Sequence, residues 1–166
     1  MSRNEFETPM RLIDIAPKEA HRIVPLLQEL HALHVTHQPD RYPADPDGAA
    51  LARWLETWLS EPSLTARAAV SPQGRIMGYV IYGIEERPAL PVRRAETRAM
   101  LHHVAVAKSW QRMGVATALI TDMKRSVAAK GVPVIATTYA SFNTASAALM
   151  QRMGLLPVMV MAEWRG

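Results

Sequence analysis

The sequence predicts a single α/β domain in which helices flank a mixed, mainly antiparallel sheet. Its 166 residues, 49% of them hydrophobic, suit one soluble domain with a sizeable core. Strand-like and helix-like segments follow one another in the order β-α-α-β-β-β-α-β-α-β, which is typical of layered α/β proteins. An apolar strand-like run also turns directly into a helix within residues 104–119. We expect residues 1–9 to be a flexible N-terminus and residues 10–166 to form the domain.

The first third of the chain predicts one strand and two helices. Apolar positions recur at helical spacing on either side of Pro25, and this proline either divides the first helix or marks its true start. In the second helix, Trp54 and Trp58 lie four residues apart, which suits packing in the core or along a cleft. The expected elements are a strand over 11–16, a helix over 17–34, a proline-rich loop over 37–46 and a helix over 48–60.

The remainder supplies five more strands and two helices. Gly131 and Gly154 follow helical segments and are expected to end them. The final strand is apolar and could support a homodimer. The expected elements are strands over 64–70 and 75–84 joined by a turn at 71–74, a charged loop over 85–96, a strand over 97–107, a helix over 111–130, a strand over 132–140, a helix over 143–153 and a strand over 157–164.

Composition narrows the classes of function. The chain has no cysteine, which excludes disulfides, thiolate catalysis and cysteine zinc sites. The net charge of +4 is mild and its basic residues are scattered, so we expect no nucleic-acid partner, although such a charge suits an anionic cofactor. A polar N-terminal sequence and the lack of a long apolar run predict a cytoplasmic protein with no membrane partner.

The strand-to-helix segment at 104–119 is the most informative motif. A helix N-terminus exposes unpaired backbone N–H groups and the positive end of the helix dipole, an arrangement that binds phosphate. Gly114 and Ala116 keep side chains small where a pyrophosphate must approach the backbone. The segment therefore predicts a site for a phosphorylated cofactor.

Two motifs together resemble the GNAT superfamily of N-acetyltransferases. The first is Gln111-x-x-Gly114-x-Ala116 after an apolar strand, and the second is Asn143, with Ser146 three residues later and a Leu-Met-x-x-x-Gly-Leu run at 149–155. They cover residues 97–160 in the family's order. The resemblance implies a sheet splayed between its fourth and fifth strands and acetyl-CoA, or another acyl-CoA, lying in the gap. The cofactor-binding residues it implies are Val104, Ala105 and Val106 beside the pantetheine, Gln111, Arg112, Met113, Gly114, Val115 and Ala116 at the pyrophosphate, and Asn143 at the pantetheine arm.

Acetyl transfer to an amine requires that the amine lose a proton first. An alkylamine has a pKa of about 10.4, whereas an imidazole, with a pKa of about 6.5, is suited to accept that proton directly or through water. His102 is our first candidate for the base and His103 the second. Strand alternation would place them on opposite faces, with His102 on the side of Met100, Val104 and Val106. The alternative is that both simply hydrogen-bond to neighbouring structure.

The expected acid of this family is missing. Met150 stands where the helix commonly carries a tyrosine that protonates the departing thiolate, and methionine has no proton to give. A thiol with a pKa of about 8.5 is a tolerable leaving group, so the loss lowers the rate without abolishing the reaction. Tyr139, Ser141 or water could take over the role, and Tyr139 is our candidate.

The acceptor side is less clearly specified. The resemblance implies that the loop between the first two helices and the loop at 85–87 line the acceptor cleft. His31, His34 and His37 have a helical spacing that could suggest a metal site, but a polar pocket wall or a solvated helix end fits better, and we expect no metal. We therefore expect an N-acetyltransferase that moves acetyl from acetyl-CoA to a primary amine of a small molecule or peptide, by direct attack in a ternary complex. The alternatives are a non-catalytic acyl-CoA sensor on the same fold and a basic nucleic-acid-binding module.

Overall fold

A computed structural model of the protein describes residues 8–166, so most of the predicted flexible N-terminus, residues 1–7, lies outside the described part. Five strands form one sheet in the order β1-β2-β3-β4-β5, with antiparallel pairing as far as β4 and parallel pairing between β4 and β5. This confirms the predicted mixed, mainly antiparallel sheet. The strands are β1 (Arg11–Asp14), β2 (Leu64–Val70), β3 (Ile76–Arg87), β4 (Glu96–Val106) and β5 (Val134–Thr137).

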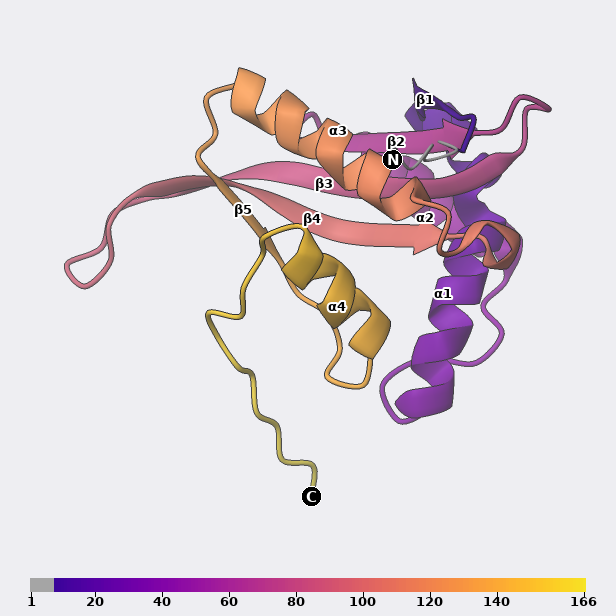
Figure 1. The fold of residues 1–166 in the computed structure, drawn as a ribbon. Helices are drawn as coiled ribbons and strands as arrows, with labels where there is room; N and C mark the ends of the chain where they lie inside the picture. Colours follow the sequence, from indigo (N-terminus) through magenta and orange to yellow (C-terminus); the bar gives the residue numbers. More distant parts are fainter. Residues whose placement is uncertain (1–7) are drawn as a thin grey trace, which may run out of the picture.

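Helices cover both faces of this sheet (Figure 1). One core cluster joins the first helices to buried side chains such as Tyr79 and Ile81, and a second joins the later helices to Tyr82 and Leu101. The two faces are therefore closed by different parts of the chain. The helices are η1 (Pro17–Ile23), α1 (Val24–His37) and α2 (Gly48–Leu59) on the first face, η2 (Lys108–Trp110), and α3 (Val115–Ala129) and α4 (Thr144–Arg152) on the second.

Pro25 marks the true start of an α-helix. The preceding segment, Pro17–Ile23, is a 3₁₀ helix, and α1 begins at Val24 with the proline in its first turn. A proline is tolerated there because the first N–H groups of a helix have no partner within it. The predicted single helix is thus two helices, and the second continues to His37, where the loop between α1 and α2 begins.

The final strand expected over 157–164 is absent. In the described chain, residues after Gly154 pair with no strand, and Val158 and Val160 are almost fully exposed. Figure 1 shows this segment leaving the body of the fold. Apolar alternation favours a strand only where another strand offers backbone partners. Glu163 instead forms ion pairs with Arg41 and Arg165, beside the loop after α1.

Other predicted boundaries shift by a few residues. The charged loop is shorter than expected because β3 runs on to Arg87 and β4 starts at Glu96. Glu85 and Arg98 face each other there, with carboxylate and guanidinium 2.9 Å apart. Within residues 8–166, no helix combines the length and the apolar content needed to cross a membrane.

Candidate active site

Strand β4 is paired on both edges for only part of its length. Its pairing with β5 ends where Leu101 faces Thr137, whose hydroxyl donates to the Leu101 carbonyl at 2.9 Å. Beyond this point β4 continues to Val106 with β3 on one edge and no described strand on the other. The backbone of residues 102–106 is therefore open to an extended ligand on the β5 side. The predicted residues Val104, Ala105 and Val106 lie within this stretch.

The segment after β4 is a turn, not the first turn of a helix. Helix α3 begins at Val115 instead of Gln111, because Arg112 (φ 63°) and Gly114 (φ 81°) both have left-handed backbone conformations that interrupt a helix. The side chain of Gln111 donates to the Val106 carbonyl at 3.2 Å, which ties the turn to the end of β4. Among the described residues, none accepts a hydrogen bond from the N–H groups of 112–117. These groups can bind an anion.

Two glycines shape this region, one in the turn itself and one in the neighbouring strand β3. A Cβ on Gly114 would meet no atom within 4 Å, so the backbone there faces open space. A Cβ on Gly78 of β3 would lie 2.8 Å from the Ala105 carbonyl and 3.0 Å from the Val115 side chain. Gly78 thus lets the start of α3 pack closely on the sheet. Val115 is itself only 1% exposed, so its side chain belongs to the core and only its N–H can serve a ligand.

Asn143 and Tyr139 lie in the segment between β5 and α4. The Asn143 carbonyl oxygen Oδ1 accepts from the Ser146 N–H at 3.0 Å and caps α4, which leaves its NH₂ group to donate to a ligand. Tyr139 is 37% exposed. No hydrogen bond in the described chain joins its hydroxyl to either histidine of β4.

A bulge in β4 places both histidines on one face of the sheet. Ile81 pairs with His103 and Tyr82 with Leu101, so His102 is the extra residue. The ring of Trp58 on α2 lies 5.3 Å from each imidazole, measured between ring centroids. The expected placement on opposite faces is therefore wrong, because the bulge interrupts the alternation on which it rested.

The two histidines have different surroundings. Burial, together with His102 and His34 nearby, lowers the pKa of His103 from 6.5 to about 4. Burial raises the pKa of Tyr79, whose hydroxyl oxygen lies 3.5 Å from Nδ1 of His103. His103 is therefore neutral at neutral pH, and its ring contacts a phenol that stays protonated. His102, by contrast, is exposed.

Near this pair, rings from six parts of the chain form two groups, one on α2, β3 and β4 and one at the end of α1, and His34 of the second group is close enough to His103 to lower its pKa. The Trp54 and Trp58 rings stack at 5.3 Å, and Phe142 stacks on His37 at 4.2 Å. Tyr42 lies in the loop expected to line the acceptor cleft, whereas Tyr79 and Phe142 were not predicted because they belong to distant segments without a motif. We call these ten residues the aromatic cluster: His31, His34, His37, Tyr42, Trp54, Trp58, Tyr79, His102, His103 and Phe142.

The histidines of α1 are engaged with these rings and with backbone carbonyls. His34 and His37 each bond to the carbonyl four residues earlier, and His31 bonds to the Pro43 carbonyl. Within the described residues, no three histidine, aspartate or glutamate side chains come together as a metal site.

Met150 is a buried core residue of α4. It is 2% exposed and packs in the core cluster that α3 and α4 form with the sheet. A side chain at this position contributes packing. The proton donor that the family's helix commonly supplies has no equivalent here.

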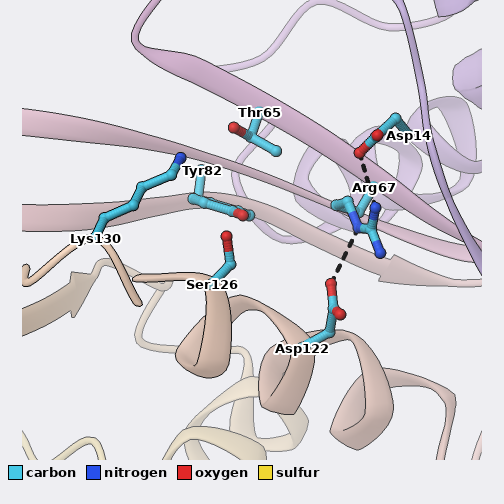
Figure 2. A pocket seen from close by; sticks show the side chains of 7 residues that line it. All are labelled: Asp14, Thr65, Arg67, Tyr82, Asp122, Ser126 and Lys130. Atoms are coloured by element: carbon cyan, nitrogen blue, oxygen red, sulfur yellow. Dashed lines mark hydrogen bonds and ion pairs between the residues drawn. The ribbon is translucent and has the colours of Figure 1, made fainter. Parts of the chain in front are cut away.

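A separate pocket of about 360 Å³ lies between α3 and strands β1 to β3 (Figure 2). Arg67 lies at one end, bonded to Asp14 at 2.8 Å and to Asp122 at 3.0 Å, while Lys130 lies at the other. Tyr82 on its wall belongs to the core cluster of the α3 face, whereas the Trp58 ring and both histidines lie on the other face. The pocket is therefore distinct from the aromatic cluster.

A mixed sheet whose fourth and fifth strands part beside an open helix N-terminus defines the class of acetyltransferases of the GNAT fold. The sequence profile of the acetyltransferase (GNAT) family matches residues 27–155, and the chain belongs to this family. No curated protein matches the chain.

Solved structures share the fold at low sequence identity. A mutant of the BH1408 protein from Bacillus halodurans is 13% identical over 93% of this chain and 99% of its own, with a TM-score of 0.84. The aminoglycoside N-acetyltransferase AAC(6')-Iy, in complex with CoA, is 20% identical over 95% of each chain, with a TM-score of 0.73. The aminoglycoside acetyltransferase meta-AAC0020, from an uncultured soil metagenomic sample, is 17% identical over 95% of each chain, with a TM-score of 0.66.

Proposed function

We propose that the protein is an N-acetyltransferase that moves acetyl from acetyl-CoA to a primary amine by direct attack in a ternary complex. The observation that carries the proposal is open backbone at two neighbouring places, the unpaired edge of β4 at residues 102–106 and the free N–H groups of the turn before α3. An extended pantetheine arm can pair with such an edge as an added strand does. A pyrophosphate fits the turn, where Gly114 leaves open space.

His102 is the proposed base. It accepts the proton that the amine loses, directly or through water, while the amine nitrogen forms a bond to the acetyl carbon and the bond from that carbon to sulfur breaks. Deprotonating an alkylamine at pH 7.4 costs about 4 kcal/mol. The Trp58 ring helps here, because an apolar neighbour disfavours the charged ammonium. His103, neutral at the pH of the reaction, positions the reacting groups by hydrogen bonding.

Tyr139 is the proposed donor to the departing thiolate. Its hydroxyl is accessible, and it lies four residues before Asn143, whose NH₂ group is free for the pantetheine arm. Replacing Tyr139 with phenylalanine should lower the rate without changing affinity for acetyl-CoA. A thiolate is a fair leaving group, so a reduction of about 10²-fold is the upper expectation.

The test is release of free thiol from acetyl-CoA with a panel of primary amines. The wild type should release thiol with at least one amine, and His102→Ala should lose most activity at low pH, where spontaneous deprotonation of the amine is rarest. An unchanged pH–rate profile would remove His102 as the base. Tight binding of acetyl-CoA without turnover of any amine would favour the acyl-CoA sensor, the alternative that the buried Met150 keeps open.

We further propose that two copies associate through the C-terminal segment. Val158, Met159, Val160 and Met161 are each more than 80% exposed, and the outer edge of β5 pairs with no described strand. Pairing of this segment with the β5 edge of a second copy would bury these apolar side chains and give the backbone of β5 a hydrogen-bonding partner. Sedimentation of the wild type should show a dimer, and Val160→Lys should shift it to monomer; a monomeric wild type would contradict the proposal.

A further inference from the structure

The aromatic cluster contains imidazoles and rings but no paired carboxylate. Across the described residues, no hydrogen bond or ion pair joins any of its members to an aspartate or glutamate. The two titratable neighbours that lower the pKa of His103 are His102 and His34, and neither is a carboxylate. A carboxylate close to this buried ring would raise its pKa instead.

Several carboxylates on neighbouring elements are engaged elsewhere. Asp47 caps α2 by accepting from the Ala50 N–H at 2.8 Å. Glu85 pairs with Arg98, and Glu163 pairs with Arg41 and Arg165. Other carboxylates of these elements, Glu29, Glu56 and Glu86, form no hydrogen bond or ion pair with the cluster in the described chain. The cluster itself therefore offers a cationic ligand ring faces with no carboxylate paired to them.

This chemistry disfavours an acceptor with several ammonium groups. Each extra ammonium would lose water against an uncharged wall, and burial of an unpaired charge is costly. A ring face attracts a cation only weakly at an exposed site. A monoamine avoids this cost because its single ammonium is the group that must become neutral to react.

The ring faces also suit a flat substrate group. The Trp54 indole is 49% exposed and stacks on Trp58, which in turn contacts the proposed base His102. The Trp54 ring also lies 6.4 Å from that of His103, so an aromatic ring laid on Trp54 would lie on the face of the sheet that carries both histidines. A flexible aliphatic group could fill the same space but would gain no ring stacking.

We infer that the acceptor is a small monoamine bearing an aromatic ring, held against Trp54 and Trp58, and not a polycation such as an aminoglycoside or polyamine. The inference rests on the proposed function, because it names the acceptor of the same site. It sets this chain apart from the aminoglycoside acetyltransferases that share its fold.

The first test compares thiol release with 2-phenylethylamine, 2-cyclohexylethylamine, spermidine and neamine. We expect kcat/KM to be several-fold higher for the phenyl than for the cyclohexyl amine and at least tenfold lower for the two polycations. A polycation preferred over both monoamines would overturn the inference and leave the proposed function standing. If no amine is turned over, the proposed function fails. The inference about the ligand is then tested by calorimetric binding of the same amines. It stands if 2-phenylethylamine binds more tightly than spermidine and is overturned if it does not.

The second test uses matched variants on α2. Trp54→Leu should raise KM for 2-phenylethylamine about three- to tenfold with little change in kcat, and Trp54→Phe should restore most of the affinity. Glu56→Gln is the control, because Glu56 lies about 200° around the helix from Trp54. Equal KM values in Trp54→Leu and wild type would overturn the inference, provided that circular dichroism shows both folded.

Discussion

Replacing His103 with asparagine tests the buried imidazole beside the proposed base. The pKa of His103 falls from 6.5 to about 4 on folding, mainly through burial. Above pH 6.5 the ring is neutral in the folded and the unfolded chain and contributes nothing to pH dependence. Below pH 6.5 the unfolded chain binds a proton that the folded chain excludes. The free energy of unfolding therefore falls by about 1.4 kcal/mol per pH unit until about pH 4.

Urea unfolding at pH 7.5 and at pH 4.5 measures this contribution. Between pH 6.5 and 4.5 the wild type should lose about 2–3 kcal/mol more than His103→Asn, because the variant has no group that titrates in this way. The comparison with the variant cancels the carboxylates that both proteins share. Parallel stability curves for the two proteins would refute a buried, neutral His103 and return it to candidacy as the base.

Three further substitutions follow from packing and ion pairs. Met150→Tyr should destabilise the fold by about 1–3 kcal/mol without raising thiol release, because the site is 2% exposed; a faster enzyme would show that the hydroxyl reaches the thiolate. Gly78→Ala should weaken acetyl-CoA binding and lower Tm, because its Cβ would press on the Ala105 carbonyl; unchanged values for both would refute the close packing. Asp122→Asn should cost about 1 kcal/mol of stability by removing one partner of Arg67, and thermal unfolding unchanged from wild type would contradict that pairing.

The sequence predicted the architecture well where local signals were strong. Hydrophobic periodicity located the five strands of the described sheet and its four α-helices. The Gln-x-x-Gly-x-Ala motif located the connection from β4 to α3, although the helix starts at Val115 and not at Gln111. The sequence left open whether Pro25 divides the first helix or marks its start, and the structure shows that it lies in the first turn of α1. The prediction of a final strand over 157–164 was wrong. A strand forms only beside a partner strand, and apolar alternation within one segment does not reveal whether a partner is present.

The candidate site was only partly predictable. The open edge of β4 followed from family resemblance, but the bulge at His102 depends on how β3 and β4 pair and has no signature in either strand alone. The same holds for Phe142 and Tyr42, which meet histidines of α1 only after the chain folds. Burial likewise gives His102 and His103 different surroundings, a difference that their adjacent positions in one strand do not reveal.

Calorimetric titration with acetyl-CoA tests the central claim most directly. Gly114 and Gly131 both have a left-handed backbone (φ 81° and 71°), and a Cβ on either would meet no atom within 4 Å, so a valine at each should strain the fold similarly. The account predicts that wild type and Gly131→Val bind acetyl-CoA with similar affinity, whereas Gly114→Val does not bind it. Equal affinity in Gly114→Val and Gly131→Val would contradict a pyrophosphate site at the turn before α3.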